Sequence, residues 1–215
     1  MKINHGKICQ YFNHNSGFTL IELLIAMFVG LIVLGATYSV FIAQNKEYKK
    51  QEQIVVMQQN ARMAMDMMTR EIMMAGYGNS TMPRCSGTTY TSSTTCVGIT
   101  AANANSISFS TDLNDTGILG GPNEYMTYDL YSSSGIQTLG RVANGSRAPV
   151  VENISSLTFA YLNAAGAATT NLSLIRTIQI SITAQTANID LDSGAVRTFT
   201  LTSNVTPRNL GIAGY

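Results

Sequence analysis

A long apolar stretch stands near the start of the chain. Residues 18–43 comprise 26 amino acids with one residue among Asp, Glu, Lys, Arg and His, Glu22, and no proline. At ~1.5 Å per residue, a helix of this length is about 39 Å long and exceeds the roughly 30 Å hydrocarbon core of a bilayer. A buried core helix is the alternative, but a helix that is apolar on every face needs a large protein around it. We therefore predict a membrane-spanning helix over residues 18–43.

From residue 44 onward the apolar positions become periodic. They recur every three or four residues, at Ile54, Met57, Ala61, Ala64 or Met65, Met68, Ile72 and Ala75. The opposite face is polar, with Gln58, Arg62, Asp66 and Arg70. Gly76, Gly78 and Asn79 then offer the left-handed conformations that end a helix. The pattern predicts an amphipathic helix over residues 44–78, which continues the membrane segment as one helix of about 58 residues.

Beyond residue 78 the apolar period changes to two, and Ser, Thr, Asn and Gly become frequent. Ile178, Ile180 and Ile182 alternate with polar residues, as Phe199 and Leu201 do. Further candidate strands, with turn clusters at 132–135 and 144–145, are 106–110, 124–131, 136–142 and 150–162. Such alternation is typical of antiparallel strands with one buried face. We predict an α+β protein in which a long N-terminal helix packs on the antiparallel β-sheet of a head formed by residues 79–215.

Charge is sparse and balanced along the chain. The 13 Lys and Arg and the 12 Asp and Glu residues give a net charge of +1, and 12% of the chain is charged, about half the usual share. Binding to nucleic acid through bulk charge is therefore disfavoured. Residues 80–215 contain six arginines and seven acidic residues. With charges so nearly balanced, a DNA-binding surface there would have to be a local patch.

The segment ahead of the apolar stretch is polar and basic. Residues 1–17 contain Lys2 and Lys7 and no acidic residue, which favours a cytoplasmic N-terminus. A secretory signal has a small-residue cleavage site after its apolar core, and no such site follows the apolar stretch here. Both histidines, His5 and His14, fall in this leader. Once the leader is removed, no histidine is left for catalysis or metal ligation.

The junction between the leader and the apolar stretch resembles a known processing signal. Residues 16–22 read Ser-Gly-Phe-Thr-Leu-Ile-Glu. Followed by a long apolar helix, this sequence resembles the N-terminal signal of type IV prepilins and pseudopilins. The resemblance implies that a prepilin peptidase cleaves between Gly17 and Phe18 and methylates the new N-terminal Phe18. Ser39 stands where many major pilins have a proline, which argues against local melting of the membrane helix.

Four further segments narrow the resemblance. Residues 70–78, 121–128, 151–157 and 207–210 are similar to PilW-type minor pilins. The resemblance implies a structural subunit, without enzymatic activity or a cofactor, that primes pilus assembly at or near the fibre tip. The implied partners are other minor pilins, the major pilin, prepilin peptidase, the inner-membrane assembly platform and membrane lipid. The implied location is the inner membrane, with the head in the periplasm, and the cell-surface pilus after assembly.

Two other functions stay open. A J-type pseudopilin of a type II secretion system has the same kind of N-terminus and architecture. A tip module that binds a surface or DNA is the alternative of a different class. An enzyme is less well supported, since we find no phosphate-binding loop, nucleophile elbow or paired carboxylates.

The carboxylate of Glu22 needs a partner in an apolar helix, because a charge at the centre of a membrane helix costs about 2.5–3.5 kcal/mol. The amine of Phe18 on a neighbouring subunit, which cleavage creates, is one candidate partner. A capping box, in which Thr19 and Glu22 satisfy amides of the first turn, is the other interpretation. Both can hold together, and we expect Thr19 and Glu22 to serve subunit–subunit assembly.

The chain has three cysteines, of which Cys9 falls in the leader. The other two, Cys85 and Cys96, are separated by a Ser- and Thr-rich loop and are expected to form a disulfide in an oxidising periplasm. A redox site is the alternative, but the pair lacks the close spacing of redox-active thiols.

A short acidic motif lies between two candidate strands. Asp112, Asn114 and Thr116 have the spacing of calcium ligands and are followed by a glycine. The twelfth position of this loop holds Asn123 where a glutamate is expected, and Glu124 comes one residue late. We favour a hairpin turn built on Asp and Asn side chains, and calcium is the alternative.

Overall fold

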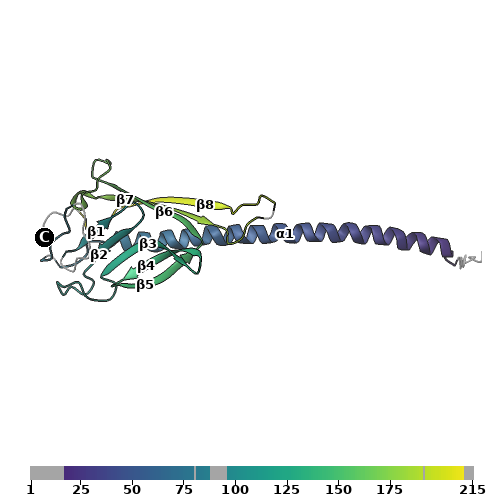
Figure 1. Cartoon of the computed structure of the whole chain (residues 1–215), viewed down its shortest axis with the longest axis horizontal. Helices are drawn as coiled ribbons and strands as arrows, with labels where there is room; N and C mark the ends of the chain where they lie inside the picture. The colour runs from purple at the N-terminus through teal and green to yellow at the C-terminus, as the bar shows by residue number, and fades with distance from the viewer. Residues whose placement is uncertain (1–16, 80, 88–95, 191, 211–215) are drawn as a thin grey trace, which may run out of the picture. The chain divides into compact units, whose positions relative to one another are not determined.

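The computed structural model describes residues 17–79, 81–87, 96–190 and 192–210 (Figure 1). The chain divides into two compact units, Met1–Tyr48 and Lys49–Tyr215. One helix, α1 (Leu20–Met73), contributes to both units. Among the described residues, eight strands and the short 3₁₀ helix η1 (Leu172–Leu174) lie in the second unit.

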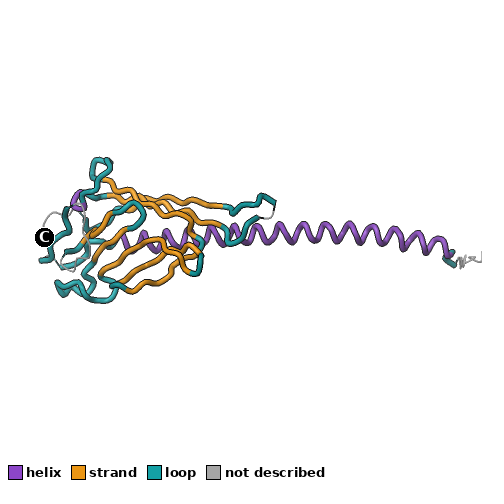
Figure 2. Tube along the Cα trace, in the orientation of Figure 1, coloured by secondary structure: helices purple, strands orange, loops and turns teal. Residues whose placement is uncertain are grey.

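The strands form two antiparallel sheets (Figure 2). The first sheet has the order β1–β2–β3–β4–β5, with strands Gly98–Ala102, Ile107–Ser110, Tyr125–Ser133, Ile136–Ala143 and Ser146–Glu152. The second sheet has the order β6–β7–β8, with strands Ile154–Leu162, Thr177–Gln185 and Thr198–Val205. The predicted α+β class, a long N-terminal helix packed on antiparallel strands, is confirmed.

The prediction of a single sheet is wrong, because the chain changes sheets at Asn153. The sequence suggested one strand over 150–162, yet Val151 pairs with β4 and Ile154 pairs with β7. Asn153 lies between them with φ of 61°, in the left-handed region that asparagine adopts more readily than most residues. The Asn153 carbonyl accepts a hydrogen bond from the Gln185 N–H at 2.9 Å. This turn therefore ends one sheet and begins the other.

The remaining predicted strands are confirmed with small shifts of their ends, whereas β1 was not predicted. Two hairpin turns were also recognisable in the sequence. Ser134 and Gly135, between β3 and β4, have φ of 53° and 83°, and Asn144 and Gly145, between β4 and β5, have φ of 47° and 83°. Two consecutive positive φ angles define the turn type that matches the twist of a two-residue hairpin.

The periodic apolar face of α1 shares one core with both sheets. Its fully or nearly fully buried members are Met57, Ala61, Ala64, Met65, Met68 and Ile72. On β7, Ile178, Ile180 and Ile182 belong to the same core, whereas Gln179 between them is exposed. Each large apolar side chain buried in this way contributes about 1.5–3 kcal/mol. The predicted amphipathic pattern is confirmed, and it is this packing that holds the last turns of α1 to the strands (Figure 1).

Helix α1 ends at Met73, a few residues before the predicted glycine. The chain tightens there, because Met74 and Ala75 donate to carbonyls three residues back, each at 3.0 Å. Gly76 then has φ of 80° and donates its N–H to the Ser110 carbonyl at 3.0 Å. The left-handed glycine thus ends the helix and directs the chain to β2.

Candidate functional sites at the two ends of the helix

The predicted processing site lies at the exposed start of α1. Gly17 and Phe18 precede the helix, and Phe18 is 83% exposed. In the described part of the chain, no atom apart from the neighbouring residues lies within 4 Å of the position that a Cβ at Gly17 would take. The rest of the predicted leader, residues 1–16, lies outside the described residues. Gly17 and Phe18 are therefore both exposed in the described part of the chain.

Thr19 caps the first turn of the helix. Its Oγ1 accepts the Glu22 N–H at 3.3 Å, and its carbonyl accepts the Leu23 N–H at 3.2 Å. The first contact is one half of a capping box. It places the Glu22 carboxylate in the first turn of α1, where the positive end of the helix dipole favours a negative charge.

The first unit exposes an apolar helix surface. An 18-residue window of α1 has a mean hydropathy of 2.5, and none of this window is buried. By length and composition α1 can cross a membrane, a property that N-terminal signal sequences share. An apolar surface of this extent is suited to lipid or to other apolar helices, which agrees with membrane anchoring.

Two hydroxyl groups within this apolar segment are satisfied by the helix itself. Thr37 Oγ1 donates to the Val33 carbonyl and Ser39 Oγ donates to the Gly35 carbonyl, each at 2.8 Å. Such bonds allow a hydroxyl to lie in an apolar environment without a further partner. The helix is continuous through Ser39, as expected from the absence of proline there.

At its other end, α1 is joined to the first sheet by a polar network centred on Glu71. Tyr128 Oη donates to Glu71 Oε2 at 2.6 Å, and Arg141 Nε lies 3.0 and 2.9 Å from the two Glu71 oxygens. Arg141 also donates to Asn123 Oδ1 at 2.9 Å. Burial, and then the adjacent Glu71 carboxylate, raise the pKa of Tyr128 well above its usual range. Tyr128 therefore remains a hydrogen-bond donor to Glu71 at physiological pH.

The segment 207–210 closes the C-terminal end of α1. The Arg208 N–H donates to the Met73 carbonyl at 3.1 Å, and Asn209 Nδ2 donates to the Met74 carbonyl at 3.4 Å. The last carbonyls of a helix lack partners within the helix. Residues more than a hundred positions away in sequence supply them here.

The four segments that resemble PilW-type minor pilins thus have structural roles. Residues 70–78, 121–128 and 207–210 meet at the C-terminal end of α1, and residues 151–157 contain the turn between the sheets. The sequence did not reveal the network around Glu71. No local signal marks Glu71, because Asp66 is likewise acidic and next to a buried residue, Met65, yet it is exposed.

Cys85 and Cys96 form the expected disulfide. Both residues are buried, and the Cys85 N–H donates to the Val97 carbonyl at 3.1 Å. Residues 88–95, within the loop that the bond closes, lie outside the described part of the chain. The disulfide ties the segment after α1 to the residues just before β1.

Replacing Cys85 and Cys96 together by serine should lower the free energy of unfolding by about 3 kcal/mol, because the disulfide restricts the unfolded chain. Urea denaturation of the purified full chain measures the change. Dithiothreitol should shift the wild-type curve to that of the double variant, and Cys9→Ser, in the predicted leader, serves as a control with no shift. Complete alkylation of both thiols in freshly isolated protein would contradict the disulfide.

A second ionic cluster holds the loop between β7 and β8 to α1. Lys50 Nζ lies 3.4 Å from Asp190 Oδ1 and also contacts Asp192, and Arg197 Nη2 lies 2.9 Å from Asp190 Oδ2. The Asp190 side chain is 5% exposed. The hydrogen bond from Arg197, followed by the Asp192 N–H and the charge of Lys50, lowers the pKa of Asp190 to about 2.

Asp190→Asn should destabilise the protein at neutral pH, and the difference from wild type should fade in acid. The pKa of Asp190 is lower in the folded chain than the ~3.9 of an unfolded aspartate. Its charge therefore contributes stability at every pH above about 4, and this contribution is lost as the pH falls towards about 2. The pKa of Lys50 is raised, chiefly by its hydrogen bond to Asp192, so Lys50 remains charged throughout.

Urea denaturation of both proteins at several pH values between about 2 and 8 measures this difference. Asp66→Asn is the matched control, because it removes the same charge from an exposed pair with Arg70, and such pairs contribute little. A difference between wild type and Asp190→Asn that grows in acid would contradict the role of the Asp190 charge.

The residues of the calcium-like motif lie in one turn between β2 and β3. The Thr116 N–H donates to Oδ1 of Asp112 and to Oδ1 of Asn114, each at 3.1 Å. Asp112 is fully buried, whereas Asn114 and Thr116 are exposed. Bonds of this kind form in a turn built on Asp and Asn side chains.

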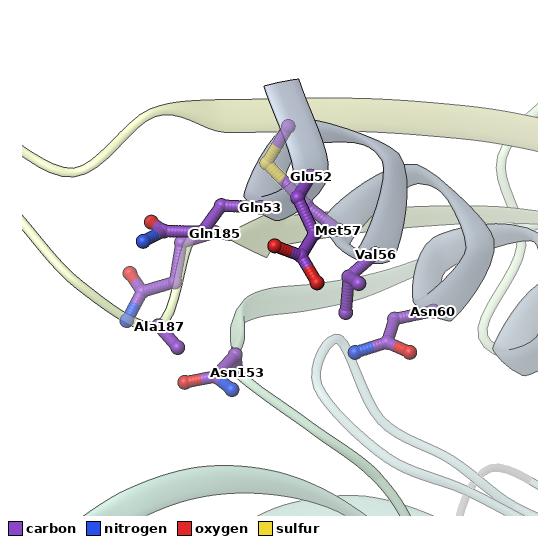
Figure 3. A pocket seen from close by; sticks show the side chains of 8 residues that line it. All are labelled: Glu52, Gln53, Val56, Met57, Asn60, Asn153, Gln185 and Ala187. Atoms are coloured by element: carbon purple, nitrogen blue, oxygen red, sulfur yellow. The ribbon is translucent and has the colours of Figure 1, made fainter. Parts of the chain in front are cut away.

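A small hollow of about 170 Å³ lies beside α1 in the second unit (Figure 3). Its lining residues are Glu52, Gln53, Val56, Met57, Asn60, Asn153, Gln185 and Ala187. Figure 3 shows the side chains of α1 on one side of the hollow and Asn153, Gln185 and Ala187 on the other. The volume is below that of typical ligand pockets, and we assign no ligand to it.

Two family models match the chain, one over the start of α1 and one over the rest of the helix and the strands. A family model described as the prokaryotic N-terminal methylation motif matches residues 12–38. A second model, described as prepilin peptidase-dependent protein B, matches residues 50–205. The fold and the N-terminal motif define a type IV pilin-like protein, and the chain belongs to the family of prepilin peptidase-dependent protein B. These families are structural proteins of the pilin type. No curated protein matches the chain, and no solved structure matches it.

Proposed function

We propose that the protein is a minor type IV pilin, a structural subunit that primes pilus assembly at or near the fibre tip. The main support is that two family models match the chain one after the other. The N-terminal methylation motif matches residues 12–38, and prepilin peptidase-dependent protein B matches residues 50–205. The exposed apolar helix between the two motifs supports membrane storage before assembly. The partners in this proposal are prepilin peptidase, the inner-membrane platform, the major pilin and other minor pilins.

The proposal divides the chain into four parts. Residues 1–17 are the leader, residues 18–43 span the inner membrane, residues 44–78 are the amphipathic helix and residues 79–215 form the periplasmic head. Cleavage after Gly17 creates the amine of Phe18. In the assembled fibre, this amine pairs with Glu22 of an adjacent subunit.

The Glu22 pairing is supported by the position of the carboxylate. Thr19 holds Glu22 in the first turn of α1, in a segment with no other Asp, Glu, Lys, Arg or His from Phe18 to Ala43. Such a carboxylate is costly in lipid unless a cation neutralises it. The amine of Phe18, which cleavage creates four residues before Glu22, is such a cation when it comes from an adjacent subunit.

A DNA-binding tip is less well supported by the head. Five of its six arginines contact partners within the second unit, with side-chain bonds from Arg84, Arg141, Arg147, Arg176 and Arg197 to carboxylates or carbonyl oxygens. An arginine held in this way is less able to contact a phosphate. The near balance of charge in residues 80–215 points in the same direction.

Deletion of the encoding gene tests the proposal against a pseudopilin role. We expect loss of surface fibres and of twitching motility, with normal secretion of exported enzymes, and restoration of both phenotypes by the wild-type chain. A strain that keeps its fibres and loses enzyme secretion would show instead that the protein is a J-type pseudopilin.

A further inference from the structure

The loop between β2 and β3 contains two buried carboxylates. Asp112 is 0% exposed and Glu124 is 1% exposed. They lie at opposite ends of the loop, just beyond the last residue of β2 and just before the first residue of β3. The Thr111 N–H donates to the Glu124 carbonyl at 2.8 Å, so the backbone brings the two ends together.

The first half of the loop gathers oxygen atoms. Asp112 Oδ2 accepts the Gly117 N–H at 2.9 Å, and Asp112 Oδ1 shares the Thr116 N–H with Asn114 Oδ1. Thr116 Oγ1 lies 2.7 Å from Asn114 Oδ1 and 3.2 Å from the Ile118 carbonyl oxygen. Side-chain oxygens of residues 112, 114 and 116 and the carbonyl of residue 118 thus lie within one turn.

The second half of the loop contains a buried oxygen without a partner. Glu124 Oε2 accepts the N–H groups of Gly120 and Gly121, at 2.9 and 2.5 Å. Glu124 Oε1 is buried and has no hydrogen-bond partner among the described residues. A buried carboxylate oxygen in this condition costs free energy and calls for a ligand.

This oxygen faces the first half of the loop. A Cβ built on Gly121 would lie 2.8 Å from Glu124 Oε1 and 2.9 Å from Asn114 Nδ2, so the two side chains meet over Gly121. Gly121 leaves this space open because it has no side chain. The buried oxygen and the Asn114 side chain therefore border the same open space.

The backbone also explains why the glutamate comes one residue later than in a regular calcium loop. Asn123, at the expected position, has φ of 61° and is exposed. This left-handed residue turns the chain, so that the next side chain, Glu124, points inward. Gly117, at the sixth position, has φ of 73°, as the sharp turn of such loops requires.

We propose that this loop binds a Ca²⁺ ion through Asp112, Asn114, Thr116, the Ile118 carbonyl and Glu124. All five groups offer oxygen, the ligand that Ca²⁺ prefers, and an irregular loop suits its flexible coordination better than the octahedral demand of Mg²⁺. Two carboxylates balance the charge of the ion. No three His, Cys, Asp or Glu side chains cluster around a metal position in the described part of the chain, and the remaining ligands of this site are neutral oxygens.

Calcium titration of the purified full chain in detergent, after removal of metal by a chelator, tests the proposal. Calorimetry should show one Ca²⁺ per chain with a Kd on the order of 10⁻⁴–10⁻³ M, the range of extracellular calcium modules. The melting temperature should rise with Ca²⁺ concentration, because the ion binds only the folded state. Mg²⁺ should bind at least about tenfold more weakly.

Glu124→Gln should weaken Ca²⁺ binding about tenfold or more, because it removes a charged ligand. Asp115→Asn is the matched control: it removes the same charge from the same loop at an exposed residue with φ of 56°, a conformation that asparagine tolerates. Should Glu124→Gln fail to fold, Asn114→Ala, at an exposed position, replaces it with the same expected loss. Absence of saturable Ca²⁺ binding by the folded wild type, equal affinity for Mg²⁺, or unchanged affinity in the Glu124→Gln and Asn114→Ala proteins would overturn the proposal.

Discussion

Replacing Glu22 with glutamine should leave the protein processed and inserted in the membrane but reduce its incorporation into fibres about tenfold or more. The Thr19 cap accepts the backbone N–H of residue 22, and glutamine also serves at this position of a capping box. The variant therefore removes the charge and keeps the turn. Without that charge, the Phe18 amine of an adjacent subunit stays unneutralised in the apolar core of the fibre, at a cost of about 2.5–3.5 kcal/mol for a buried charge.

Complementation of a deletion strain with Glu22→Gln, followed by quantification of cleaved protein in membranes and in sheared surface fibres, gives both readouts. Thr19→Val is the matched variant, because it removes the capping hydroxyl and keeps the carboxylate. Thr19 orients Glu22 through this bond, so the pairing account expects a smaller loss of fibres from Thr19→Val than from Glu22→Gln. Normal fibres from Glu22→Gln would show that the residue acts only as a cap.

Replacing Glu71 with alanine should lower the free energy of unfolding by about 2–3 kcal/mol, because hydrogen bonds to a charged group of this kind contribute about that much. The change leaves Tyr128 Oη, which is fully buried, and Arg141, whose side chain is 15% exposed, without their carboxylate. For a protein of this size, the melting temperature should fall by about 5–10 °C. Glu71→Gln, which still accepts a hydrogen bond from Tyr128, should lie between alanine and wild type.

Thermal unfolding of the purified full chain measures these differences. Asp66→Ala is the control on the same helix, since Asp66 pairs with Arg70 on an exposed surface, where side chains are 60% and 77% exposed. Such exposed pairs contribute about 0–1 kcal/mol. Equal melting temperatures for Glu71→Ala and Asp66→Ala would contradict the role of the Glu71 network in joining α1 to the sheet.

The helix and most strands were predictable because their signals are local. The stripe from Met57 to Ile72 repeats every three or four residues, and Ile178, Ile180 and Ile182 alternate with polar neighbours, so burial follows from the sequence itself. The left-handed Gly76, Ser134–Gly135 and Asn144–Gly145 mark the helix end and two hairpins for a similar reason. In each case a few adjacent residues determine the conformation.

The division into two sheets was not predictable from such local signals. On both sides of Asn153, polar and apolar residues alternate as in a single strand. The two segments are distinguished only by their pairing, because the first pairs with β4 and the second with β7. A single asparagine with positive φ is a weak signal, because asparagine also occurs within ordinary strands and turns. Strand β1 was missed because it is short and lacks a clear alternation of polar and apolar residues.

The candidate sites show the same contrast. Gly17, Phe18, Thr19 and Glu22 form one continuous motif, and their local geometry follows from helix capping. The partners of Glu71, in contrast, are Tyr128 and Arg141, which lie 57 and 70 residues away in sequence. Only the folded chain brings these three side chains together. Likewise, Glu124 Oε2 accepts the N–H groups of Gly120 and Gly121, contacts that only the folded loop creates.

The central claim, that the protein is a processed pilin subunit, is tested most directly by the intact mass of the chain recovered from membranes and sheared fibres. We expect a single species that begins at Phe18, lacks residues 1–17 and contains one additional methyl group. Tandem mass spectrometry should place that methyl group on the amine of Phe18. A protein recovered from both fractions that still contains Lys2 and begins at Met1 would contradict the account.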